Sequence, residues 1–166
     1  IAHGETFVIP GNDKQVLDQI ERWNINAIVG SPHQLGNLVR TASDSGRSAP
    51  TLKTIGSFGA VLPDSVSREI TEQFRVNLVS LYGSSEGGII ARREGLNSNA
   101  GHAGRLLDDV EYRVIDENGN ELPESSIGLI GVKRANQPQE YFNDPEGTRQ
   151  AFRDGFFYAG DMGYFK

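Results

Sequence analysis

Apolar residues in the first half of the chain follow two patterns. Helical spacing predicts three helices, over residues 13–23, 31–42 and 63–74. The second of these helices has a typical start, with Ser31 as N-cap and Pro32 at the first helical position. Short apolar runs predict four strands, over residues 5–10, 26–30, 52–59 and 76–83. This alternation is typical of a parallel sheet covered on both faces, and we expect Trp23 to lie in its core.

The second half of the chain has a different pattern. Residues 110–116 alternate between apolar and polar, a turn with Asn-Gly follows, and residues 127–134 again resemble a strand. A short helix is expected over 144–152, and strand and turn over 154–165. The predicted fold class is therefore α/β: a parallel-sheet βαβ lobe followed by a small antiparallel β-barrel-like lobe. The lobe boundary near residues 92–103 predicts domains 1–95 and 96–166.

Composition narrows the possible functions. The chain has 166 residues, a net charge of −6 and no cysteine. An acidic chain is a poor general binder of nucleic acid, and without cysteine it can form neither disulfides nor thiolate metal sites. No apolar run approaches the roughly 20 residues of a membrane span, and no leader is visible, so a cytoplasmic location is expected. The sequence gives no indication of an oligomeric state.

The stretch Tyr-Gly-Ser-Ser-Glu-Gly-Gly at residues 82–88 follows a predicted strand. In open parallel sheets, ligands bind beyond the carboxyl ends of the strands. Glycines allow close backbone approach, serine hydroxyls can bind phosphate oxygens, and a carboxylate such as Glu86 can hold Mg²⁺ beside a phosphate. Tyr82 offers a flat face for a base. A purely structural glycine turn is the alternative interpretation at this point.

A second candidate is Asp161 in Ala-Gly-Asp-Met-Gly, after an aromatic run. A carboxylate on a tight turn can accept two hydrogen bonds from a ribose diol, as the acidic residue of dinucleotide folds does. Gly-Asp is also a common turn dipeptide, so Asp161 alone does not decide between these readings.

Several motifs in order resemble the adenylate-forming superfamily of acyl-CoA synthetases, peptide-synthetase adenylation domains and luciferases. The stretch SLYGSSEGG is similar to that family's Tyr-Gly-x-Thr-Glu motif, and SFGAVLP to its Gly-Gly-Ala-x-Leu segment. Further similar segments are GHAGRLLDDVEYRVIDENGNELPESSIGLIGVK and YFNDPEGTRQAFRDGFFYAGDMGYF. The resemblance covers essentially the whole chain.

The resemblance implies an acid–thiol ligase. Such enzymes use ATP and Mg²⁺ to turn a carboxylic acid into an acyl-adenylate, and then pass the acyl group to CoA. By the matched positions, the catalytic residues are Ser85, facing the phosphates, and Glu86, the metal ligand. The nucleotide-binding residues implied are Gly59, Ala60, Tyr82, Gly83, Ser85 and Asp161. Tyr82 would stack on adenine, Gly83 would let the ligand approach, and Asp161 would bind the ribose hydroxyls.

The sequence also departs from the family pattern. Ser85 replaces a threonine, Phe58 replaces a glycine, and Ala159 replaces the threonine before Gly-Asp. Alternative functions are therefore a peptide-synthetase adenylation domain or a non-catalytic nucleotide-binding or scaffold relative. The chain lacks a starting methionine, and the family's phosphate loop and catalytic lysine match none of its residues. We therefore expect a fragment, inactive by itself, of an enzyme of fatty acid metabolism.

Overall fold

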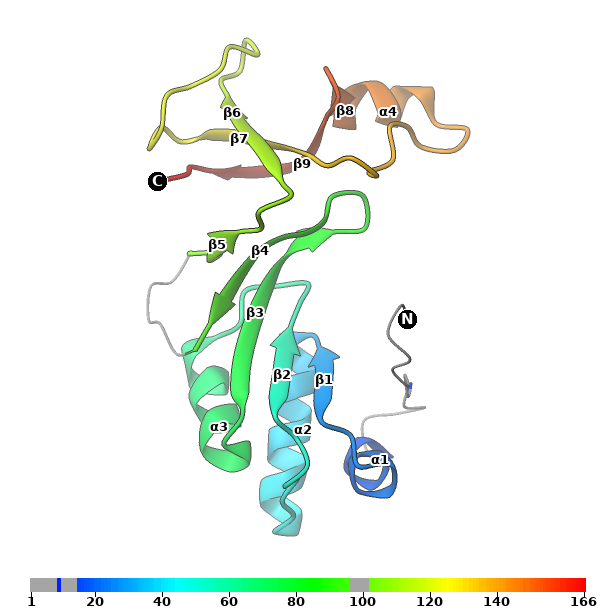
Figure 1. Ribbon diagram of the computed structural model, residues 1–166, viewed down its shortest axis with the longest axis vertical. Helices are drawn as coiled ribbons and strands as arrows, with labels where there is room; N and C mark the ends of the chain where they lie inside the picture. Colours follow the sequence, from blue (N-terminus) through cyan, green and yellow to red (C-terminus); the bar gives the residue numbers. More distant parts are fainter. Residues whose placement is uncertain (1–8, 10–14, 96–101) are drawn as a thin grey trace. The chain divides into compact units, whose positions relative to one another are not determined.

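The structure is a computed structural model that describes residue 9 and residues 15–95 and 102–166 (Figure 1). The chain divides into two compact units. Unit 1 comprises residues 1–82 and 92–104, and unit 2 comprises residues 83–91 and 105–166. The strand predicted over residues 5–10 falls almost wholly outside the described residues. The predicted domain boundary between residues 95 and 96 adjoins an undescribed segment and stays a prediction.

Unit 1 contains three helices, α1 (Val16–Trp23), α2 (Pro32–Ser45) and α3 (Asp64–Phe74). The predicted start of α2 is confirmed: Ser31 Oγ accepts a hydrogen bond from the Gln34 amide at 3.3 Å, and Gln34 Oε1 accepts one from the Ser31 amide at 2.9 Å. This reciprocal pair satisfies two amides that the helix itself leaves unbonded. Helix α2 ends at Gly46, whose φ of 64° is in the left-handed region.

The sheet of unit 1 begins with three parallel strands, β1 (Ala27–Gly30), β2 (Thr54–Ser57) and β3 (Asn77–Ser84). Ile28 pairs with Ile55, which pairs with Leu78. The predicted parallel sheet is therefore confirmed. In the strand order β1-β2-β3-β4-β5, β3 is followed by β4 (Gly88–Glu94), which begins in unit 2, and by β5 (Arg105–Leu106) of unit 2. Sequence reasoning missed β4, which makes the glycine-rich stretch after β3 the turn of a hairpin.

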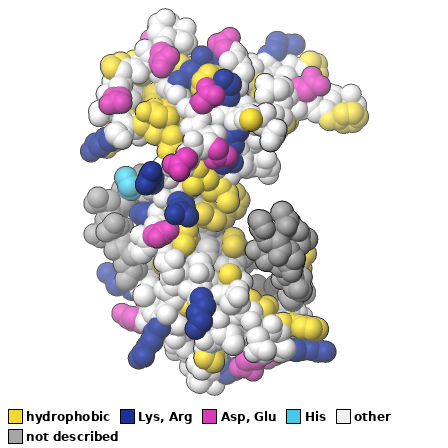
Figure 2. All heavy atoms as spheres, in the orientation of Figure 1, with side chains coloured by type: hydrophobic (Ala, Val, Ile, Leu, Met, Phe, Trp, Pro, Cys, Tyr) yellow, Lys and Arg dark blue, Asp and Glu magenta, His cyan; other side chains and the backbone are white. Residues whose placement is uncertain are grey.

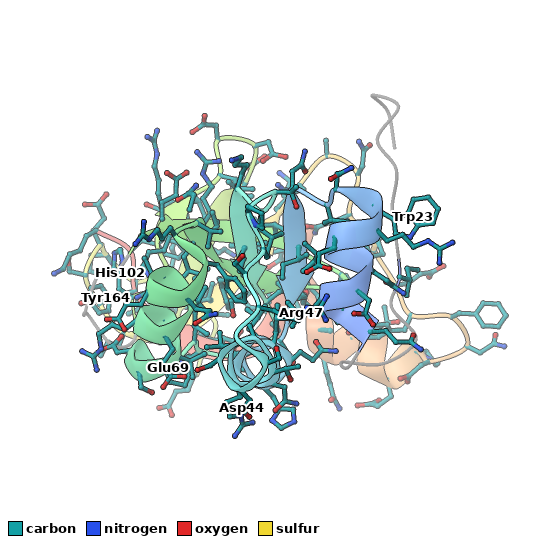
Figure 3. All side chains as sticks on the ribbon, turned by 90° about the horizontal axis from the view of Figure 1, so that it is seen from below. Trp23, Asp44, Arg47, Glu69, His102 and Tyr164 are labelled. Atoms are coloured by element: carbon teal, nitrogen blue, oxygen red, sulfur yellow. The ribbon has the colours of Figure 1, made fainter. Side chains whose placement is uncertain are left out.

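The core of unit 1 is a cluster of buried aliphatic side chains and one phenylalanine, contributed by all three helices, by strands β2 and β3 and by the loops around them. Helices α2 and α3 lie on the same side of the strands (Figures 1 and 3). Val29 in β1 is 68% exposed. The described residues thus leave one face of β1 open, and the expected coverage of both sheet faces stays a prediction there.

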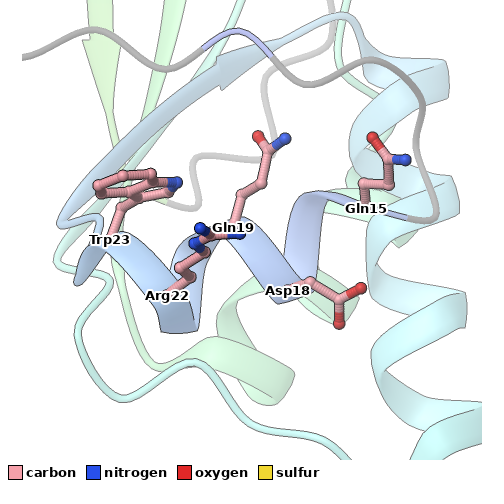
Figure 4. Close-up of a pocket in the computed structure, with 5 residues that line it drawn as sticks. All are labelled: Gln15, Asp18, Gln19, Arg22 and Trp23. Carbon is pink, nitrogen blue, oxygen red and sulfur yellow. The ribbon is translucent and has the colours of Figure 1, made fainter.

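Trp23 does not lie in the core as expected; it is 57% exposed. Helix α1 buries Leu17 and Ile20, and Trp23 is the last helical residue before Asn24, where the backbone becomes left-handed. Its ring projects outward, with the Arg22 guanidinium 5.3 Å from the ring centroid (Figure 3). The surface pocket beside it is lined by Gln15, Asp18, Gln19, Arg22 and Trp23 (Figure 4). None of these is a predicted site residue.

Unit 2 contains an antiparallel sheet in the order β6-β7-β9-β8. Its elements are β6 (Glu111–Ile115), β7 (Gly128–Lys133), α4 (Pro145–Ala151), β8 (Phe152–Arg153) and β9 (Phe156–Gly163). The predicted hairpin turn at Asn118-Gly119 joins β6 to β7, and Asp144 caps α4 by accepting the Gly147 amide. The predicted fold class, a parallel α/β part followed by antiparallel strands, is confirmed.

The surface of the described residues is mixed in charge. On the face shown in Figure 2, acidic and basic side chains are interspersed. Within the part of the chain that the structure describes, no helix has both the length and the apolar character that a membrane crossing requires.

Candidate nucleotide and metal site

The glycine-rich stretch forms the turn between β3 and β4. Ser84 Oγ accepts a hydrogen bond from the Gly87 amide at 2.9 Å, which closes the turn over Ser85 and Glu86. A side chain at Gly83 would collide with the carbonyl oxygen of Gly88. The hairpin itself therefore requires glycine at position 83. This structural requirement adds to the predicted role of Gly83, which is to let a ligand approach.

Glu86 is half-buried on this turn and is bound by a residue far along the chain. The phenol of Tyr141 donates a hydrogen bond to Glu86 Oε1 at 2.7 Å. This hydrogen bond lowers the pKa of Glu86 below its usual range, and the Glu86 amide and the Ser84 hydroxyl act in the same direction against partial burial. The same contact raises the pKa of Tyr141. Both shifts favour a neutral phenol beside a charged carboxylate.

Arg134, just after β7, lies beside the same turn. Gly88 has a φ of 63°, and a Cβ added there would lie 2.6 Å from Arg134 Nη1. The other terminal nitrogen of Arg134 donates a hydrogen bond to Asp109 Oδ1 at 2.8 Å, which lowers the pKa of Asp109. The Arg134 side chain is 21% exposed. A fixed positive charge therefore lies next to the turn that carries Glu86.

Three of the predicted site residues belong to unit 1. Gly59 and Ala60 are exposed just beyond the carboxyl end of β2. Gly59 has a φ of 92°, which L side chains rarely adopt, so glycine is needed there even though the space beside it is open. Tyr82 is half-buried on β3. Their predicted roles stay predictions.

The other four predicted residues belong to unit 2. Gly83, Ser85 and Glu86 lie together on the turn, with Ser85 exposed. Asp161 is exposed on β9. The fold thus gathers three of the four on one turn, and Asp161 is placed on another element of the same unit.

Sequence reasoning missed the roles of Tyr141 and Ser84. Tyr141 lies in the family-like stretch Tyr-Phe-Asn-Asp-Pro-Glu-Gly-Thr, but the sequence indicates no role for it because its hydrogen-bond partner lies 55 residues away. The sequence assigns a phosphate-binding role to Ser85 and none to Ser84. The spacing of Ser84 and Gly87, typical of a side chain that closes a turn, was the available signal.

Glu86 fits a magnesium ligand in its chemistry. It is an ionised oxygen donor on an accessible turn, and Mg²⁺ prefers one or two carboxylates together with phosphate oxygens over a cage made only of protein ligands. Among the residues that the structure describes, no group of three or more histidine or acidic side chains could form such a cage. The arrangement suits an ion that arrives with a nucleotide.

Comparison with known proteins defines the class. The model of the AMP-binding enzyme family matches residues 1–142. An indoleacetate–CoA ligase of Aromatoleum aromaticum is 29% identical over 151 residues, covering 89% of this chain and 29% of that protein. A 3-hydroxybenzoate–CoA/4-hydroxybenzoate–CoA ligase of Thauera aromatica is 28% identical over 166 residues, covering 96% of this chain and 31% of that protein.

The fold agrees with this match. The crystal structure of the anthranilate–CoA ligase AuaEII in complex with anthranoyl-AMP superposes with a TM-score of 0.83 at 20% identity, covering 96% of this chain and 32% of that one. This likeness supports the fold alone. The chain belongs to the AMP-binding enzyme family, within which its relatives are CoA ligases. It spans about a third of the length of these relatives.

Proposed function

We propose that this chain is part of an ATP-dependent carboxylic acid–CoA ligase. The observation that carries the proposal is the match to the AMP-binding family over residues 1–142, together with an ionised glutamate on the glycine-rich turn within that match. In the proposed reaction, the acid attacks the α-phosphate of ATP to form an acyl-adenylate and release pyrophosphate. The CoA thiol then takes the acyl group and AMP leaves.

The proposed roles follow the chemistry of the side chains. Tyr82 stacks on adenine, Gly59 and Ala60 line the adenine and acyl pocket, and Asp161 accepts hydrogen bonds from the ribose hydroxyls. Ser85 donates to phosphate, and Glu86 is the Mg²⁺ ligand. Bound Mg²⁺ would supply stabilisation for the negative charge that gathers on the phosphates in the transition state. A preformed turn can meet that charge without reorganising.

The acid substrate is proposed by class. Because two relatives are named for indoleacetate and hydroxybenzoates, we propose an aromatic carboxylic acid as the first candidate, and fatty acids as the second. Because the chain spans only about a third of its relatives, we propose that the isolated 166 residues do not catalyse adenylation.

Carboxylate-dependent exchange of pyrophosphate into ATP tests the proposal. The longer protein that contains this chain is expected to exchange pyrophosphate with at least one acid from a panel of indoleacetate, 3- and 4-hydroxybenzoate and straight-chain fatty acids. Addition of CoA should then yield the acyl-CoA. Binding of ATP without exchange for any acid would instead favour the non-catalytic relative, and transfer only to a carrier-protein thiol would favour the peptide-synthetase type. Exchange by the isolated chain would refute its proposed inactivity.

A further inference from the structure

Tyr141 and Glu86 are joined by the hydrogen bond that connects the loop before α4 to the glycine-rich turn. The bond is short, at 2.7 Å, and both side chains are half-buried. Hydrogen bonds to charged groups are about twice as strong as neutral ones. This contact is therefore well suited to hold one rotamer of a carboxylate that otherwise has three freely rotating bonds.

Tyr141 is itself fixed on two sides. Its amide donates to Thr148 Oγ1 at 2.9 Å, and Thr148 Oγ1 donates to the carbonyl oxygen of Asp144 at 2.7 Å. The Tyr141 ring meets Phe152 edge-on, with the ring centroids 5.3 Å apart. The backbone and the ring are thus both held, so the phenol oxygen has a defined position before any ligand binds.

The turn that carries Glu86 is anchored to the same aromatic cluster. Phe157 of β9 packs on Phe152, with the ring centroids 5.2 Å apart. A Cβ built on Gly87 would lie 3.5 Å from Phe157 and 3.3 Å from Val132. Phe157, which is only 3% exposed, therefore lies against both the Phe152 ring that Tyr141 contacts and the turn that carries Glu86. Their spacing is fixed by packing within unit 2.

We propose that Tyr141 is a positioning residue that holds the Glu86 carboxylate in the orientation in which it binds the nucleotide-associated Mg²⁺. The inference rests on the proposed function, since it assigns Glu86 to the metal. A carboxylate has about four lone-pair sites, so the phenol occupies one and leaves others for the ion. Loss of a partner that orients a metal ligand typically weakens metal binding or activity by about 10–100-fold.

The test uses the longer protein that contains this chain, with Tyr141→Phe as the central variant. The substitution keeps the ring on Phe152 and removes only the hydroxyl. Tyr112→Phe is the matched control, because it removes the same hydroxyl from a ring that stacks on Phe165 in the same unit. Binding of Mn²⁺ in the presence of ATP is followed by electron paramagnetic resonance, and pyrophosphate exchange is measured across a Mg²⁺ titration.

For Tyr141→Phe we expect the Mn²⁺ dissociation constant and the half-saturating Mg²⁺ concentration to rise roughly tenfold. The rate at saturating Mg²⁺ and the KM for the acid should stay near the wild-type values, a split that a general loss of structure would not produce. Tyr112→Phe should behave as wild type. Thr148→Val should shift the metal affinity in the same direction as Tyr141→Phe, while Thr148→Ser, which keeps the hydroxyl, should not.

Two other outcomes would overturn the inference and can be told apart. If Glu86→Gln weakens Mn²⁺ binding but Tyr141→Phe does not, the proposed function survives and Tyr141 only ties the loop to the turn. If wild-type protein binds no metal–ATP complex, or Glu86→Gln leaves that binding unchanged, the metal role of Glu86 fails, and the positioning role of Tyr141 fails with it.

Discussion

Unit 1 and unit 2 are stabilised by different kinds of contact. Unit 1 encloses a continuous apolar cluster, with Leu17, Ile20, Ile55 and Ile70 at most 1% exposed. Unit 2 buries fewer large apolar side chains and relies more on polar and cation–aromatic contacts around its sheet. Its residues include the three described carboxyl groups whose pKa values are lowered by hydrogen bonds, Glu86, Asp109 and Asp116. The proposed metal ligand therefore lies in the part that depends more on polar contacts.

Arg113 illustrates the difference. Its guanidinium donates hydrogen bonds to the Tyr158 hydroxyl, the Arg153 carbonyl oxygen and Asp154, and lies 4.3 Å from the Phe156 ring centroid. One side chain of β6 thereby joins β9 and the β8–β9 turn. In unit 1, packed aliphatic side chains hold the helices and strands together.

The largest effect is expected from Ile70→Ala in unit 1. Ile70 is fully buried, so the substitution removes apolar contacts and leaves a cavity. The free energy of unfolding should fall by about 2–5 kcal/mol. Hydrogen exchange followed by mass spectrometry should show protection lost across unit 1 and retained in unit 2. Val61→Ala, at a site 75% exposed, is the matched control and should change little. Equal loss of protection in both units would contradict the comparison.

A smaller effect is expected from Arg113→Ala in unit 2. Because hydrogen bonds made by a charged group are lost, the free energy of unfolding should fall by about 1–3 kcal/mol. The loss of protection against hydrogen exchange should be confined to β6, β8 and β9. Arg113→Lys keeps the charge without the planar fork of donors, so it should restore only part of the protection. Full protection in Arg113→Ala would mean that unit 2 does not depend on this polar contact.

The smallest effect is expected from lowering the pH. Hydrogen bonds from Tyr141, Arg134 and Asn120 lower the pKa values of Glu86, Asp109 and Asp116 from ordinary values of 4.5, 3.8 and 3.8. Between those values and the lower folded-state pKa values, the unfolded chain binds more protons, so stability falls as the pH falls. Amide protection in unit 2 should therefore decline below about pH 4 before that of unit 1. The opposite order would contradict the comparison.

Periodicity predicted the elements of unit 1 well because packing of one apolar face decides them. The N-cap at Ser31 and the apolar run of each strand are local patterns. Trp23 was misplaced because a helix pattern shows which residues are apolar, and says little about which faces its neighbours cover. Strand β4 was missed because its buried residues Ile90 and Ala91 are adjacent and are followed by two arginines and a glutamate, so apolar and polar positions do not alternate strictly.

In the candidate site, too, some residues can be predicted from the sequence and others cannot. Ser85 and Glu86 could be predicted because both polar side chains lie on one short glycine-rich stretch. The partner of Glu86 could not be found, because the contact with Tyr141 depends on how β9 brings two distant loops together. A pattern along the chain identifies groups that can bind a ligand, whereas the groups that orient them are identified by tertiary packing.

Glu86→Gln in the longer protein tests the central claim most directly. Glutamine keeps the size of the side chain and can still accept the Tyr141 hydrogen bond, but it lacks the charge needed to hold Mg²⁺. The rate of pyrophosphate exchange with a substrate acid, measured across a Mg²⁺ titration, should fall on the order of 100-fold. The melting temperature of the protein should stay unchanged. A variant that exchanges pyrophosphate at the wild-type rate and with the wild-type Mg²⁺ dependence would contradict the assignment of the metal to this turn.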